Sequence, residues 1–195
     1  CNDWMTGLIP AFARRMGIPC LFTVHNIHTQ KVTLAEIEDR GIDAAEVFNE
    51  LYYEYPPYNY EESRSNNKVD LLASGIFSAH FINTVSPTFL KEIVNGWHSF
   101  IPDNIRREIA NKYNNGCAIG ILNAPDEGCN PVKDDHLEVK YSSKDHHNGK
   151  IRNKIAFQSK TGLTINDRAP LLFWPNRLDP VQKGCQLLTD ILYRI

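Results

Sequence analysis

Four short apolar runs, separated by stretches with helical periodicity, most constrain what this chain can fold into. The runs cover residues 20–24, 81–85, 119–122 and 171–174. Each is rich in β-branched, aromatic or leucine side chains and shows little polar alternation, as is typical of strands buried in a parallel sheet. Strands that alternate with helices along a chain predict an α/β fold with a mostly parallel sheet.

The stretches between these runs carry helix signals. Apolar residues from Met5 to Met16 share one helical face, and Gly17 to Pro19 ends the helix. Ser86 followed by Pro87 has the form of an N-cap with proline in the first turn, which predicts a helix over 88–94. Further expectations are helical stretches over 34–53, 69–77 and 150–160, and a surface loop over 61–68.

A polar stretch over 126–149 divides the chain. It contains two glycines, one proline and a run of charges, with little apolar periodicity, and is therefore predicted to be a linker. We expect residues 1–125 to be the later part of one domain and 150–195 the opening helix and strand of a second. Because the first residue is Cys1 rather than methionine, we also expect the chain to be part of a longer one.

Composition narrows the classes of function. The net charge of −2 gives no long-range attraction to nucleic acid or to anionic lipid. No apolar run approaches the roughly 20 residues of a membrane span, and no signal peptide is visible. Five scattered cysteines without a Cys-x-x-Cys pair argue against a disulfide framework and a zinc site, and indicate a reducing cytoplasm. We expect no nucleic-acid partner, no membrane, no metal and no cofactor.

The strongest local feature is the pair His25-Asn26, which directly follows the run 20–24. In open parallel sheets ligands bind just beyond the carboxyl ends of the strands. A sugar or a phosphate could be held at this point. Position alone leaves open a second interpretation, in which both residues merely close a turn.

Two cations follow the run 171–174. Asp179 could cap a helix, with Pro180 in its first turn and Gln182 three residues after the cap. Arg177 and Lys183 would then lie beside a helix N-terminus, an arrangement suited to a diphosphate. The alternative is a pair of surface cations next to a well-capped helix.

Two weaker candidates lie elsewhere. Asn123 directly follows the run 119–122 and would face a cleft between domains. Asp3 could be either a site residue or a helix N-cap.

Six motifs in a fixed order identify a family. They are Asp3-Trp4, Thr-Val-His-Asn at 23–26, Thr-Val-Ser-Pro-Thr at 84–88, Gly-Ile-Leu-Asn at 120–123, Asn153-Lys154 with Gln158 and Gly162-Leu163, and Arg177-Leu178 with Gln-Lys-Gly at 182–184. Each motif alone is modest, but the ordered set resembles bacterial glycogen and starch synthases over essentially the whole chain.

The resemblance implies a retaining glucosyltransferase of the GT-B type, with two Rossmann-like domains and no metal at the diphosphate. The donor would be ADP-glucose or UDP-glucose and the acceptor an α-glucan. The resemblance implies that His25, the catalytic candidate, lines the donor glucose and that Asn26 lies in the same site. It also implies that Asp3 and Asn123 face the cleft, and that Arg177 and Lys183 bind the diphosphate.

The chain departs from the family pattern in three ways. Ala124-Pro125 replaces the usual Gly-Val of the linker, which restricts the backbone there. Arg177 and Lys183 stand one residue further apart than usual. The N-terminal Lys-Gly-Gly loop and the glutamate of the second domain are missing, so we expect this segment by itself to be inactive.

Two other functions remain open. One is another GT-B transferase, similar to sucrose synthase or to a lipopolysaccharide glucosyltransferase. The other is a glucan-binding module without catalysis. Five tyrosines could stack on sugars or, as we favour, pack under a loop. They are Tyr52, Tyr53, Tyr55, Tyr58 and Tyr60.

Overall fold

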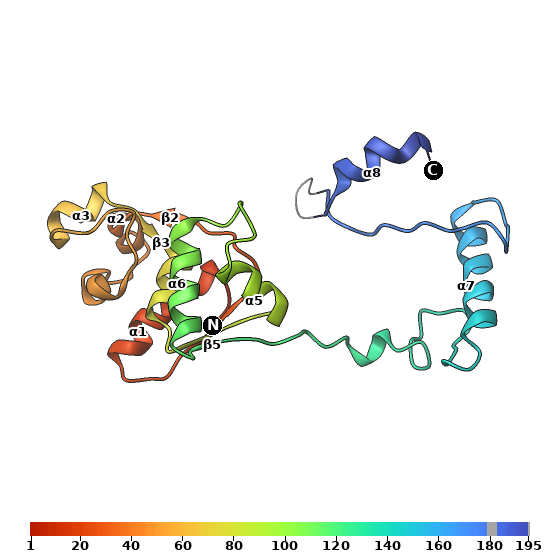
Figure 1. Ribbon diagram of the computed structural model, residues 1–195, viewed down its shortest axis with the longest axis horizontal. Helices are drawn as coiled ribbons and strands as arrows, with labels where there is room; N and C mark the ends of the chain where they lie inside the picture. Colours follow the sequence, from red (N-terminus) through yellow and green to blue (C-terminus); the bar gives the residue numbers. More distant parts are fainter. Residues whose placement is uncertain (179–182, 195) are drawn as a thin grey trace. The chain divides into compact units, whose positions relative to one another are not determined.

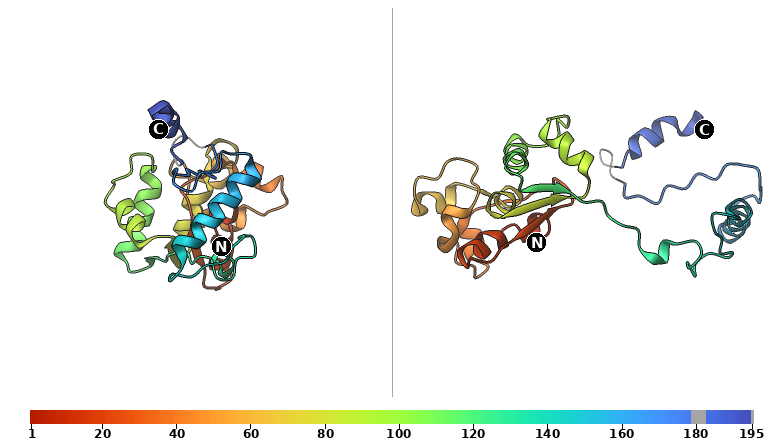
Figure 2. Two further views of the ribbon diagram at one scale, coloured as in Figure 1. Left: turned by 90° about the vertical axis from the view of Figure 1, so that its right-hand side faces the viewer. Right: turned by 60° about the horizontal axis from the view of Figure 1, so that its bottom comes forward.

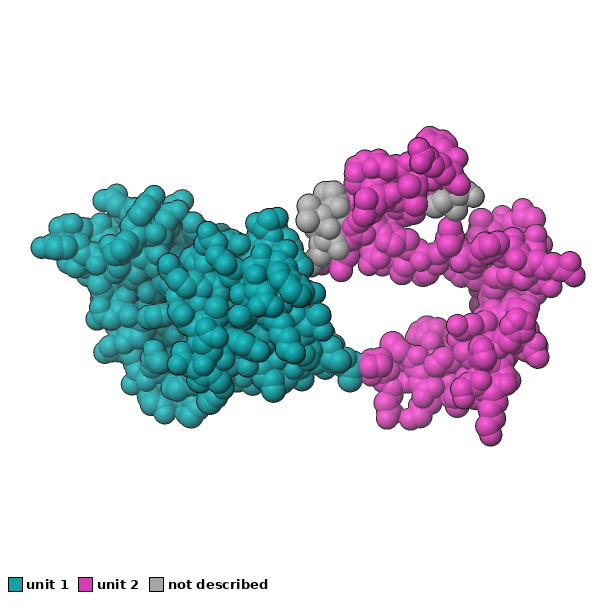
Figure 3. All heavy atoms as spheres, viewed as in Figure 1, with its two compact units in different colours: residues 1–124 teal, residues 125–195 magenta. Residues whose placement is uncertain are grey.

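The computed structural model describes residues 1–178 and 183–194. The chain forms two compact units, Cys1–Ala124 and Pro125–Ile195, which Figure 3 shows in teal and magenta. Each unit is described by itself below. Within the described ranges, none of the helices combines the length and the apolar character that a membrane span requires.

The first unit is built on a parallel three-stranded sheet in the order β1-β4-β5 (Figure 1). The strands are β1 (Leu21–Val24), β4 (Phe81–Thr84) and β5 (Ala118–Gly120). The register places Val24 beside Thr84, and Thr84 beside Gly120. The first three predicted strands are therefore confirmed, and their carboxyl ends share one edge of the sheet.

Helices precede and connect these strands. They are η1 (Trp4–Thr6), α1 (Ile9–Arg15), α2 (Leu34–Glu38), η2 (Ala45–Glu50), α3 (Tyr60–Asn66), α4 (Leu71–Ser78), α5 (Pro87–Val94) and α6 (Asp103–Asn114). The helix predicted over 88–94 is confirmed, with the Ser86 hydroxyl accepting from the Phe89 N–H. The expected loop over 61–68 is wrong, because Asn59 caps α3 by accepting from the Glu62 N–H. The expected helix over 34–53 is broken by Gly41, whose φ is +79°.

One face of the sheet carries the main core. Phe22, Val24 and Ile82 point into it and pack with side chains of α4, α5 and α6. Figure 2 shows α5 and α6 together on one side of the strands in its right-hand view. The opposite face carries Leu21, Phe81 and Ile119, whose exposed fractions are 51%, 55% and 59%.

A second, smaller core lies around an antiparallel pair of strands, β2 (Lys31–Val32) and β3 (Val69–Asp70). Thr33 caps α2 through a full capping box with Glu36. The buried Tyr53 ring packs on Phe48, at a centroid distance of 5.3 Å.

The second unit contains η3 (Glu127–Cys129), α7 (His146–Thr161), α8 (Cys185–Ile191) and η4 (Leu192–Arg194). Helix α7 confirms the prediction over 150–160, although it begins four residues earlier. The strand predicted over 171–174 is wrong, because the structure assigns no strand there and Leu172 and Phe173 are exposed. An apolar run forms a strand only beside another strand, and the described part of this unit contains none.

Side chains of α7 hold the loops on either side of it. Asn153 donates from Nδ2 to the Val139 carbonyl and accepts at Oδ1 from the Val139 N–H. The buried Gln158 amide bonds in the same two-way manner to the backbone of Asn166. Gly162 ends the helix with a φ of 72°. The motif at these positions therefore has a structural role.

We predict that Phe22→Ala lowers the free energy of unfolding by about 3–5 kcal/mol, the usual loss for a fully buried ring. Gly75 of α4 leaves the space that this ring fills, since a Cβ at Gly75 would lie 2.4 Å from it. Leu21→Ala, next in sequence but on the open face, is the matched control and should change stability by roughly 0.5 kcal/mol or less. Urea denaturation of both variants measures the difference, and equal losses would contradict the assignment of the two faces.

Candidate functional site

The buried Asp3 carboxylate organises the carboxyl end of β1. Its Oδ1 accepts hydrogen bonds from the backbone N–H of His25, at 2.8 Å, and of Asn26, at 3.4 Å. Hydrogen bonds to an ionised acceptor are roughly twice as strong as neutral ones. Asp3 therefore positions both predicted site residues through their backbone. It also stands at the N-cap position of η1, as the alternative interpretation expected, but its side chain makes no cap bond to that helix.

Asp3 reaches this position only with a strained backbone. Its φ of 53° and ψ of −178° lie in a region that almost only glycine adopts, at a cost of about 1–3 kcal/mol. Among the non-glycine residues that the structure describes, it alone has a positive φ. The strained conformation persists because parallel pairing with β1 offsets its cost. In this pairing the Asp3 N–H donates to the Thr23 carbonyl at 3.0 Å. Strain of this kind often accompanies a functional site.

The His25 side chain is exposed beyond the strand end. Its Nε2 lies 3.0 Å from Asn2 Oδ1, which orients the ring. Asn26 is half-buried, and its Oδ1 accepts from the His28 N–H at 2.8 Å. The end of β1 thus carries an imidazole and a carboxamide, hydrogen-bonding groups that suit hydroxyls or phosphate oxygens. Asn2 was not a sequence candidate, and only its place one residue before Asp3 could have indicated it.

Asn123 lies near the same edge of the sheet. It follows β5 by three residues and is exposed. The end of β5 packs tightly on the start of α5, since a Cβ at Gly120 would lie 2.3 Å from Pro87 Cα. In the part of the chain that the structure describes, no hydrogen bond joins Asn123 to Asp3, His25 or Asn26.

Arg177 and Lys183 belong to the second unit. Arg177 is exposed, and Lys183 is a half-buried residue two positions before the start of α8. The predicted cap formed by Asp179, Pro180 and Gln182 lies outside the described residues. Within the ranges described, no three histidine, cysteine, aspartate or glutamate side chains gather as a metal site.

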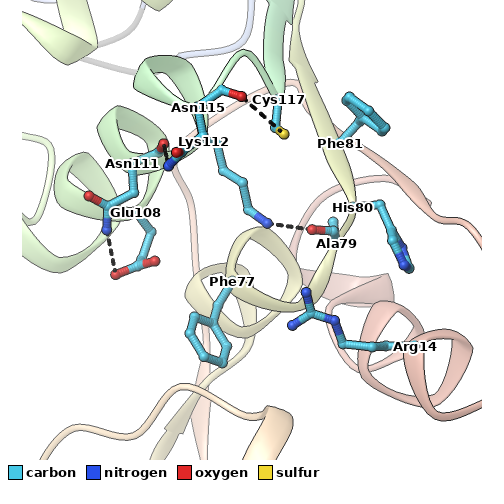
Figure 4. A pocket seen from close by; sticks show the side chains of 10 residues that line it. All are labelled: Arg14, Phe77, Ala79, His80, Phe81, Glu108, Asn111, Lys112, Asn115 and Cys117. Atoms are coloured by element: carbon cyan, nitrogen blue, oxygen red, sulfur yellow. Dashed lines mark hydrogen bonds between the residues drawn. The ribbon is translucent and has the colours of Figure 1, made fainter.

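A pocket of about 520 Å³ lies at the opposite end of the strands (Figure 4). Lys112 donates from Nζ to the Ala79 carbonyl at the end of α4, and burial lowers the pKa of this ammonium, as does the charge of Arg14. Arg14 and Lys112 lie in the last turns of α1 and α6. Helix C-termini carry partial negative charge. These cations therefore complement helix ends, and the pocket contains none of the predicted site residues.

Comparisons with known proteins agree on one family. The model of the starch synthase catalytic domain matches residues 1–106. The glycogen synthase of Cellvibrio japonicus is 34% identical over 98% of this chain and 37% of its own length. That of Exiguobacterium sibiricum is 31% identical over 98% of this chain and 38% of its own. This chain thus spans little more than a third of these relatives.

A solved structure of a starch synthase is also similar to this chain. The catalytic domain of Starch Synthase IV from Arabidopsis thaliana, bound to ADP and acarbose, is similar to the whole of this chain with a TM-score of 0.75. The two sequences are 26% identical, and the match covers 38% of that structure.

We predict that Asp3→Gly relieves the backbone strain yet loosens the end of β1. Loss of the charged acceptor should speed amide hydrogen exchange at His25 and Asn26 roughly tenfold to a hundredfold. The Thr23 amide, which donates to the Cys1 carbonyl, is the internal control and should change little. Asp3→Asn keeps an oxygen acceptor, so its exchange rates at His25 and Asn26 should lie between those of the wild-type protein and those of Asp3→Gly. Unchanged exchange at His25 in Asp3→Gly would contradict the positioning role.

Proposed function

Because this chain belongs to the starch synthase catalytic domain family, we propose that it forms part of an enzyme that transfers glucose from a nucleoside diphosphate glucose to the non-reducing end of an α-1,4-glucan. Family membership follows from the match over residues 1–106, and it confirms the resemblance to glycogen and starch synthases. The starch synthase neighbour confirms the fold class, a Rossmann-like part of a GT-B enzyme. The observation that supports the activity best is the cluster of Asp3, His25 and Asn26 at the end of β1.

The proposed donor is ADP-glucose, with UDP-glucose as the alternative, and the proposed acceptor is an α-glucan. The related plant starch synthase was bound to ADP and acarbose, which supports a nucleotide and a sugar chain in this site. The reaction is proposed to need no metal or other cofactor. We place the protein in the cytoplasm, where thiols are kept reduced, since its five cysteines are free.

In this proposal His25 contacts the donor glucose and stabilises charge as its bond to the diphosphate breaks. The imidazole suits this task because its backbone is fixed by Asp3 while its ring stays exposed. Asn26 binds sugar hydroxyls beside it, and Asn123 contributes from the end of β5. Asp3 acts by positioning rather than by direct contact.

The second unit is proposed to be the start of a second Rossmann-like domain, following a linker. There Arg177 and Lys183 bind the diphosphate. In the absence of a metal, fixed cations are needed to stabilise the charge that develops on the departing nucleoside diphosphate.

We predict that His25→Ala in the whole protein lowers kcat by at least roughly a hundredfold, the usual loss for one preorganised hydrogen-bond donor. The melting temperature should change little, because the exposed ring buries little apolar surface. His136→Ala replaces another exposed histidine, in the second unit, and is the control that should keep full activity. Normal glucosyl transfer by His25→Ala would contradict the proposal, as would collapse of the fold.

We also predict that Arg177→Ala costs about 2–4 kcal/mol of transition-state stabilisation. Lys183→Ala should cost a similar amount if the longer spacing still brings its ammonium to the diphosphate. Arg177→Lys should be poorly tolerated, because a planar fork is replaced by a point charge. The double variant Arg177→Ala/Lys183→Ala should lose less transition-state stabilisation than the sum of the two single losses, since both cations serve one leaving group.

Steady-state kinetics with ADP-glucose measures these losses. Arg168→Ala, an exposed arginine of the same unit, is the matched control. Wild-type rates for Lys183→Ala would remove Lys183 from the site and leave Arg177 as the assigned cation.

A further inference from the structure

The loop over residues 25–30, which joins β1 to β2, is fixed at both ends. At its start, the Asp3 carboxylate holds the backbone of His25. At its far end, a second buried carboxylate, that of Asp70, accepts a hydrogen bond from the Thr29 hydroxyl at 2.6 Å. Nothing in the proposed reaction so far uses this second carboxylate.

Asp70 is 2% exposed and receives hydrogen bonds from three elements. Its Oδ1 accepts from the Thr29 hydroxyl of the loop and, at 3.0 Å, from the Ala73 N–H in the first turn of α4. Its Oδ2 accepts from the Asn104 side chain of α6 at 3.2 Å. A buried carboxylate is tolerated only when its oxygens are satisfied in this way. Asp70 therefore ties the loop to two helices that pack in the main core.

Capping of α4 does not by itself account for this carboxylate. The Ala73 N–H needs one acceptor oxygen, which asparagine or serine would supply equally well. Thr29 and Asn104 bring two further donors to the same side chain. The Thr29 hydroxyl also accepts from the Leu72 N–H at 3.1 Å, so two bonds fix its direction. The arrangement thus holds the loop as well as the helix.

The part of the loop between the two carboxylates carries the candidate site. The Ile27 side chain packs against the main core, and the His28 N–H donates to Asn26 Oδ1 at 2.8 Å. The Gln30 carbonyl accepts from the first N–H of α4 whatever the side chain at Thr29. Loss of the Thr29 hydroxyl would therefore loosen the loop and leave the chain beyond it paired.

We propose that Asp70, acting through Thr29, is a second positioning residue of the transferase site. The inference rests on the proposed function for the reaction that the loop serves. Asp70 does not touch the substrate. Together with Asp3 it holds the loop from opposite ends, so that the His25 imidazole keeps one position while the sugar donor binds. A misplacement of about 1 Å can lower the rate of an enzyme roughly a hundredfold.

The test removes the bonds to Asp70 one at a time, because Asp70→Ala leaves three donors unpaired and endangers the fold. Thr29→Val in the whole protein removes the bond from the loop and keeps the shape of the side chain. Asn104→Ala removes the bond from α6 and is the matched control. Both variants weaken the contacts of the same carboxylate, so both should lower the melting temperature.

Only Thr29→Val should impair the site. Its kcat with ADP-glucose and maltotriose should fall roughly tenfold to a hundredfold. Its KM for maltotriose should stay within about twofold, because the lost contact is one made in the transition state. Amide hydrogen exchange at His28 should become roughly tenfold faster. Asn104→Ala should keep both kcat and this exchange rate within about twofold. Thr29→Ser retains the hydroxyl and should restore most of the activity.

Equal losses of kcat in Thr29→Val and Asn104→Ala would overturn the positioning role, because a general weakening of the fold would then explain both. So would a Thr29→Ser variant as slow as Thr29→Val, or wild-type exchange at His28 in Thr29→Val. The exchange measurement requires no glucosyl transfer. Failure of the wild-type protein to transfer glucose would therefore count against the proposed function, while exchange at His28 still decides whether Asp70 holds the loop.

Discussion

The contact between the Asp3 carboxylate and two backbone amides at the end of β1 is the interaction on which the site depends. It requires parallel pairing of Asn2 with Thr23, and that pairing forces Asp3 into a strained backbone. The core beneath makes the strain tolerable, because Phe22 and Val24 anchor β1 from the other direction. Packing of the core thus offsets the strain at Asp3, and Asp3 in turn fixes the backbone of the exposed His25.

The sequence predicted the elements whose signals are local. Three apolar runs form strands, and a helix begins after Ser86-Pro87, because burial patterns and helix caps depend on residues that are close together in the sequence. The position of His25 and Asn26 followed from β1 alone. The positioning role of Asp3 did not, since the contact joins residues 22 positions apart. The run at 171–174 has strand composition, but the described part of its unit offers it no neighbouring strand.

The motif on α7 shows a different limit. Asn153 and Gln158 helped to identify the family, yet in the structure both amides bond to backbone groups of flanking loops. A polar residue in a family motif can have a structural role, in which it holds a loop, or a functional role, in which it binds a ligand. Local sequence does not distinguish the two, because either partner offers the same donors and acceptors.

The open face of the sheet has a practical consequence. Leu21, Phe81 and Ile119 present neighbouring apolar side chains to water. Surfaces of this kind associate with any apolar partner at hand. At the concentrations used for crystallisation or scattering, this segment in isolation will report on its own clustering as much as on its shape. Charged substitutions at these three positions offer a route to a monodisperse sample, because their side chains point away from the core that Phe22 and Val24 enter.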